Sequence, residues 1–193
     1  MAFLSLTKKA AAVLKLDVST AGTAQQFNLP ALEDWIVDVI WSGRPTQPGL
    51  LFYNRATGFA IPLNLVEYSL GVGLTLIQKS LARLLEEHSL QSKIAYFVDL
   101  FSVIHLCRNQ DQSAVGYMTQ SKQLINNWLE IDNDQRVDNS YDLMMRINQD
   151  YRRINGHYRG SRLKEFLSSV EKIEKRYGIV TIQSDSHHDG TLH

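Results

Sequence analysis

Apolar residues recur at helical spacing through most of this chain, and that pattern limits its fold more than any other feature. In the segment 162–177 the apolar positions are Leu163, Phe166, Leu167, Val170 and Ile173, which is the spacing of a helix with one buried face. The same reasoning predicts helices over residues 5–16, 30–42, 65–88, 92–108, 114–130, 141–155 and 162–177. The segment 92–108 is apolar nearly all round, which is typical of a central buried helix.

One stretch predicts strands instead. Leu50–Tyr53 and Phe59–Leu63 flank a turn at Asn54–Gly58, the pattern of a hairpin. Its aromatic residues exceed what an isolated ribbon can bury, so they either pack on the helices or form a patch for a partner. Its edge could also add to another subunit's sheet. We therefore expect a mainly α, single-domain bundle of about six or seven helices with one small β-hairpin at 50–63.

The length of 193 residues suits one domain. We expect a single helical domain over residues 1–183 and a flexible tail over residues 184–193. Residues 1–26 are a possible docking arm, because the segment Met1–Leu16 combines apolar residues with three lysines. Its short length and alanine content favour docking on a neighbouring subunit over lying on a membrane surface.

The charge and cysteine content exclude several classes of protein. Twenty basic residues balance twenty acidic ones, whereas a protein that coats nucleic acid by bulk charge is usually basic overall. Cys107 is the only cysteine, which excludes an intramolecular disulfide framework and a Cys-rich zinc site. There is no secretory signal pattern and no apolar run of the roughly 20 residues that span a bilayer. The sequence therefore predicts a soluble, cytoplasmic protein.

The strongest candidate contact surface is the segment Tyr151–Lys164, which carries five basic residues and no acidic one. Arginine forks bind phosphate or carboxylate bidentately, and tyrosine rings can stack on bases or pack on a partner. The alternative is an ordinary solvated face on which the arginines pair with nearby carboxylates. We predict a site for a protein partner or a phosphate at Arg146, Tyr151, Arg152, Arg153, Tyr158, Arg159, Arg162 and Lys164.

Two other segments resemble a Cys/His catalytic pair and a helix-turn-helix motif, but neither has the residues at the spacing that its site requires. His105 and Cys107 would lie on different faces of a helix, so they cannot form a catalytic pair with each other. The segment 110–130 superficially resembles a DNA-reading helix-turn-helix motif. However, Gln112 and Lys122 stand where that motif needs a small and an apolar residue. We predict no catalytic residue.

A group of histidines lies at the end of the chain. His187, His188, Asp189 and His193 have no HExxH spacing and no second cluster to complete a tetrahedral site. A solvated terminus is the better interpretation, so we predict no metal and no cofactor.

The leading hypothesis is a non-enzymatic interaction or assembly protein, a helical subunit of a larger complex such as a viral structural subunit or a bacterial multiprotein machine. Its partner would be another protein or a second copy of the chain. A nucleic-acid-binding module, for RNA more than DNA, using residues 146–164 is the alternative, and an enzyme with an unrecognised site is the second alternative. Membrane contact is not expected.

Overall fold

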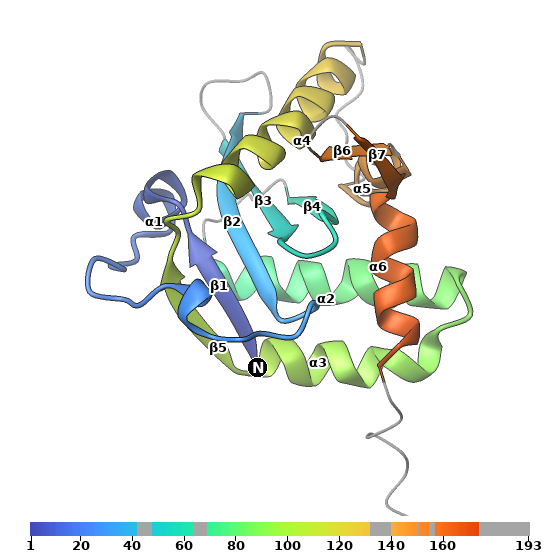
Figure 1. Ribbon diagram of the computed structural model, residues 1–193, viewed down its shortest axis with the longest axis horizontal. Coiled ribbons are helices and arrows are strands. Elements are labelled where there is room, and N and C mark those ends of the chain that lie inside the picture. The colour runs from blue at the N-terminus through green and yellow to red at the C-terminus, as the bar shows by residue number, and fades with distance from the viewer. Residues whose placement is uncertain (42–47, 64–68, 132–139, 150, 155–156, 174–193) are drawn as a thin grey trace, which may run out of the picture.

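A five-stranded mixed sheet forms the centre of the computed structural model (Figure 1). The structure describes residues 1–41, 48–63, 69–131, 140–149, 151–154 and 157–173. The strands are β1 (Ala2–Leu6), β2 (Asp34–Trp41), β3 (Pro48–Asn54), β4 (Ala60–Leu63) and β5 (Ile104–Arg108), in the spatial order β4-β3-β2-β1-β5. β1 is parallel to both of its neighbours, whereas β3 is antiparallel to β2 and to β4. A separate antiparallel ribbon consists of β6 (Tyr151–Ile154) and β7 (His157–Ser161).

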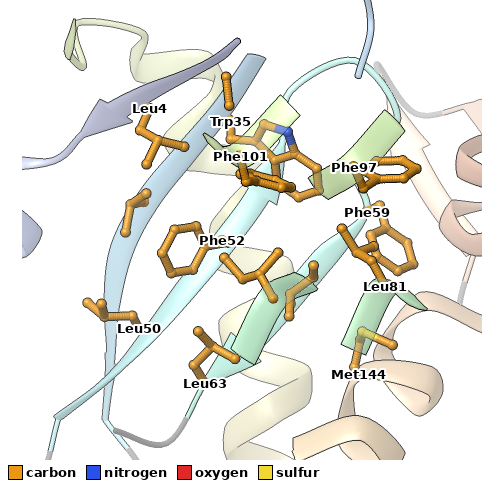
Figure 2. Packing of buried hydrophobic residues seen from close by; sticks show 14 of the residues in the cluster. Leu4, Trp35, Leu50, Phe52, Phe59, Leu63, Leu81, Phe97, Phe101 and Met144 are labelled. Atoms are coloured by element: carbon orange, nitrogen blue, oxygen red, sulfur yellow. The ribbon is translucent and has the colours of Figure 1, made fainter. Parts of the chain in front are cut away.

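Helices cover both faces of the sheet. They are α1 (Lys8–Leu14), α2 (Leu70–Glu87), α3 (Ile94–Ser102), α4 (Gln112–Ile131), α5 (Ser140–Gln149) and α6 (Arg162–Glu171), with short 3-10 turns η1 (Ala24–Gln26) and η2 (Gln91–Lys93). Side chains of α1, α2, α3 and α6 join the large cluster on one face, which we call the α2 face. Figure 2 shows its aromatic centre around Trp35, Phe97 and Phe101. α4 and α5 pack on the opposite α4 face, against Ile36, Leu51 and Tyr53.

The prediction of a helical bundle with one small hairpin is wrong, because this is an α/β fold built on a five-stranded sheet. The segment expected as a helix over 30–42 is instead the central strand β2. Trp35, Val37 and Val39 belong to the cluster on the α2 face and Ile36 and Ile40 to the cluster on the α4 face. A strand buried on both faces is a continuous apolar run, and its residues also match a helical spacing.

The expected helix over 92–108 is also wrong as a single element. The chain forms α3 up to Ser102 and then β5 from Ile104 to Arg108. An apolar run of that length fits one long helix or a short helix followed by a strand, and hydrophobic periodicity alone does not separate them. Pairing with β1 decides in favour of the strand, since the odd-numbered residues from Val103 to Asn109 satisfy their backbone groups there.

The segment 1–26, a possible docking arm, begins within the sheet and continues into α1 and η1. β1 lies between β2 and β5 with all five of its residues buried, and helix begins only after Thr7, whose hydroxyl accepts a hydrogen bond from the Ala10 N–H. The hairpin prediction is confirmed by β3 and β4, and its aromatic residues pack in the core. The expected tail, 184–193, lies outside the described residues.

The outer edge of β4 is closed by two different devices. Phe52 and Ile61 form a hydrogen-bonded pair in the β3–β4 ladder, so Ala60 and Pro62 turn their backbone groups outward. The side chain of Asn148 on α5 accepts from the Ala60 N–H at 2.8 Å and donates to the Ala60 carbonyl at 2.6 Å. Pro62 has no N–H to offer. Both devices are typical of natural sheets that avoid pairing with other chains.

Replacing Asn148 with alanine should lower the free energy of unfolding by about 2 kcal/mol, because it leaves the buried backbone groups of Ala60 without partners. Urea unfolding measures this change. Gln149→Ala is the matched control, since Gln149 is the exposed neighbour on the same helix. Equal effects of the two substitutions would mean that Asn148 does not close this edge.

Candidate interaction surface

The basic segment predicted as a contact site folds as the β6–β7 ribbon and the start of α6, where a helix end and a loop were expected. The register places Arg152 opposite Arg159 and Arg153 opposite Tyr158. The side chains of residues 151–159, which include Tyr151, lie outside what the structure describes. The described side chains of this site come from neighbouring helices.

Those helical residues divide into two kinds. Arg146 on α5 and Lys164 on α6 are exposed. Arg162 is buried, and its guanidinium donates a hydrogen bond to the Ile147 carbonyl at 2.9 Å. A cation there meets the negative end of the α5 dipole. Arg162 therefore fastens α6 to α5 rather than facing a partner.

A mostly buried ion cluster lies on the α4 face, and no sequence motif pointed to it. Arg55, just after β3, donates to Asp34 at 2.7 Å and also pairs with Asp111, which precedes α4. Arg55 also lies 3.4 Å from the hydroxyl of Ser5. Burial raises the pKa of Asp34, the charge of Arg55 lowers it in part, and Asp111 adds to the rise. The two ion pairs tie three separate chain segments together.

A second ion pair joins α4 to the same face of the sheet. Asp38 on β2 is buried, accepts a hydrogen bond from the Thr7 hydroxyl at 2.6 Å and pairs with Lys122 of α4. Asp38 also accepts from the Val39 N–H at 2.8 Å. Each of its oxygens therefore has a partner, and the arrangement positions α4 rather than presenting a reactive group.

Neither Cys107 nor His105 gains a catalytic setting in the strand. Residues two apart on a strand share a face, and here that face is covered by Phe3 and the segment around η1: Cys107 packs with Phe3 and Ala24, and the His105 ring lies beside those of Phe3 and Phe27. Cys107 is fully buried, and burial together with the charge of Asp34 raises the pKa of its thiol. A raised pKa disfavours the reactive thiolate.

Unlike the outer edge of β4, the outer edge of β5 is open. The Ala2 N–H donates to the Val103 carbonyl and the Asn109 N–H to the Leu6 carbonyl, so the odd-numbered residues face β1. The backbone groups of Ile104, Leu106 and Arg108 therefore point outward. Of these, the Arg108 N–H donates to the Gly22 carbonyl at 2.9 Å. Within the described residues, the outward N–H and C=O groups of Ile104 and Leu106 have no hydrogen-bond partner.

Apolar side chains surround this open edge. Of the five large apolar side chains that are exposed in the described residues, three lie here: Met1, Phe27 and Val103, at 50%, 44% and 56%. The ring of Phe27 lies 5.1 Å from that of Phe3 and 5.8 Å from that of His105, between ring centres. The N-terminus lies beside the end of α3 and the start of β5 (Figure 1). We call Met1, Phe27 and residues 103–106 the β5-edge surface.

The sequence predictions missed this surface for an identifiable reason. Val103–Cys107 was assigned to a buried helix, and inside a helix its backbone groups would have been satisfied locally. The signal that could have separated it is the β-branched pair Val103 and Ile104.

The described part of the chain contains neither a metal-binding cluster nor a membrane-spanning helix. In the ranges that the structure describes, no three His, Cys, Asp or Glu side chains gather closely enough to hold a metal ion. None of the helices described there has the length and apolarity needed to cross a membrane. The histidines of the C-terminal segment fall outside those ranges.

One comparison with known proteins gives a match. The family model described as "Domain of unknown function (DUF6933)" matches residues 3–161, which cover the sheet from Phe3 of β1 onward and the β6–β7 ribbon. No curated protein and no solved structure matches the chain.

Proposed function

The chain belongs to the DUF6933 family, and we propose that it is a protein-contact subunit that docks an extended strand of a partner protein on its β5-edge surface. The observation that carries the proposal is the difference between the two edges of one sheet. β4 is closed by Asn148 and Pro62, whereas β5 offers the backbone groups of Ile104 and Leu106. Main-chain hydrogen bonds supply affinity in such strand addition, and neighbouring side chains supply specificity.

The exposed side chains support the same function. Met1, Phe27 and Val103 extend the edge into an apolar area that a partner would remove from water. Open, apolar edges promote unwanted pairing, so proteins usually protect them. One edge of this sheet is protected and the opposite edge is open, which is better explained by a binding role of the open edge. An intracellular location is part of the proposal, supported by the free, buried Cys107.

Crosslinking in the native cell tests this proposal. A photoreactive amino acid at position 105, on the exposed part of the surface, should give a discrete protein adduct. The same amino acid at position 72, an exposed site on α2, should not.

A proline substitution shows whether the edge itself binds. Leu106→Pro in the position-105 protein should abolish the adduct, because it removes an outward N–H while leaving the ladder to β1 intact. Leu106→Val keeps that N–H and should keep the adduct. An adduct that survives Leu106→Pro, in a protein with an unchanged circular dichroism spectrum, would contradict strand addition.

A second candidate function is binding of RNA by the β6–β7 ribbon. The register places Arg152 directly opposite Arg159, and like charges at opposed positions destabilise a strand pair unless something neutralises them. Phosphates of a nucleic acid would do so. Arg146 and Lys164 add exposed positive charge on the adjoining helices.

Charge reversal tests this second candidate. We expect the double variant Arg152→Glu, Arg159→Glu to lose affinity for single-stranded RNA and to show a flatter salt dependence, because fewer phosphates of the RNA are neutralised by the protein. Fluorescence anisotropy between low and high salt measures both. Lys79→Glu on α2 is the control for overall charge. If wild-type protein and both variants bind RNA alike, the ribbon is not an RNA site.

A further inference from the structure

We infer that the strand docked on the β5-edge surface comes from a second copy of this chain, paired antiparallel to β5 about a two-fold axis at His105. This inference rests on the proposed function and names its partner. The edge is self-complementary. Each copy has two open N–H donors and two open C=O acceptors, on Ile104 and Leu106, and a second copy supplies the two acceptors and two donors that match them.

The register follows from which backbone groups are open. In an antiparallel pair, two residues that both face the partner exchange an N–H and a carbonyl with each other. Centring the pair on Leu106 would oppose Ile104 to Arg108 of the second copy, whose N–H already donates to the Gly22 carbonyl. Centring it on Ile104 would oppose Leu106 to Ser102, the last residue of α3.

One symmetric register uses every open group. With the axis at His105, Ile104 of each copy pairs with Leu106 of the other, and four hydrogen bonds form. Pairing extends no further than these three residues in each copy, because the N–H of the next outward residue, Arg108, already donates to the Gly22 carbonyl. The dimer would extend the sheet from five strands in each copy to a continuous sheet through both.

The same register brings the two His105 side chains face to face. They form a non-hydrogen-bonded pair, in which opposed Cα atoms lie about 4.5 Å apart. Their immediate surroundings are the rings of Phe3 and Phe27, with centres 5.0 and 5.8 Å from that of His105. Val103 would oppose Cys107 of the second copy, which places another exposed apolar residue in the interface.

A charge swap at position 105 tests the register. Wild-type protein should rise from 22.0 kDa towards twice that mass as its concentration increases. His105→Lys alone and His105→Glu alone should each stay at 22.0 kDa, because identical charges meet at the axis. An equimolar mixture of the two variants should regain the doubled mass. Sedimentation equilibrium measures all four samples.

The control places the same charges elsewhere. Val72→Lys and Val72→Glu change an exposed position on α2 and should dimerise as the wild type does. A dimer that both His105 variants retain, or that their mixture fails to restore, would overturn the two-fold pairing at His105.

The outcomes also separate this inference from the proposed function. Wild-type protein that stays at 22.0 kDa at every concentration contradicts the second copy as partner. If position 105 then still crosslinks to another protein in a Leu106-dependent way, strand addition stands with a different partner. Loss of both results would overturn both proposals.

Discussion

Replacing Arg55 with alanine should lower the free energy of unfolding by about 3 kcal/mol and the melting temperature by about 10 °C. Arg55 is the only cation that pairs with Asp34 and Asp111 within the described residues, and all three side chains are mostly buried. Without it, two carboxylates are left facing each other in a site that already raises the pKa of Asp34. Thermal and urea unfolding measure the loss.

Two further substitutions serve as controls for Arg55→Ala, one inside the Arg55–Asp34–Asp111 cluster and one outside it. Asp111→Asn in the Arg55→Ala protein should restore part of the stability, because it removes one of the two stranded charges and keeps the oxygen that accepts from the Ala114 N–H. Arg83→Ala breaks an exposed ion pair with Glu87 and should cost less than about 1 kcal/mol. Equal losses for Arg55→Ala and Arg83→Ala would show that the cluster does not hold the α4 face together.

Phe166→Ala should be the most damaging single change, with a loss of about 4 kcal/mol. Phe166 on α6 is fully buried and stacks on Phe59 with ring centres 4.1 Å apart. Its ring also lies 5.9 Å from that of Phe97 and 6.3 Å from that of Trp35. The substitution therefore opens a cavity where α3, α6, β2 and the start of β4 meet, in the region that Figure 2 shows around Phe59 and Phe97.

Phe27→Ala is the matched control, because it removes the same side chain from an exposed position. We expect it to change unfolding by less than about 1 kcal/mol and to weaken association instead. Calorimetry on dilute protein separates the two effects. A Phe166→Ala protein as stable as Phe27→Ala would place α6 outside the core.

Helices whose apolar residues line one face could be predicted from the sequence. Leu163, Phe166 and Val170 are buried in α6 as their spacing predicts, and Ile77, Leu81 and Leu84 are buried in α2. β2 and β5 could not be predicted in this way. β2 is buried on both faces, so it has no polar alternation, and β5 continues the apolar run of α3. Only pairing with β1 distinguishes these segments from helix.

The candidate surface was harder to predict than the fold, because it depends on which edge of a sheet stays open. The basic residues of the segment Tyr151–Lys164 predict a contact site there. However, one of them, Arg162, is buried and donates a hydrogen bond to α5. The open groups of Ile104 and Leu106 are backbone atoms, which carry no signature in side-chain chemistry. The closing role of Asn148 depends on a contact across 88 residues of sequence.

Hydrogen exchange at the backbone of β5 tests the central claim most directly. In dilute protein the amides of Ile104 and Leu106 should exchange far faster than that of Cys107, which faces β1, or that of Ala60, which donates to Asn148. In concentrated protein the same two amides should become protected while that of Ala60 does not change. Strong protection of both amides at every concentration would show that the edge is already closed. Fast exchange at every concentration would show that no second copy binds there.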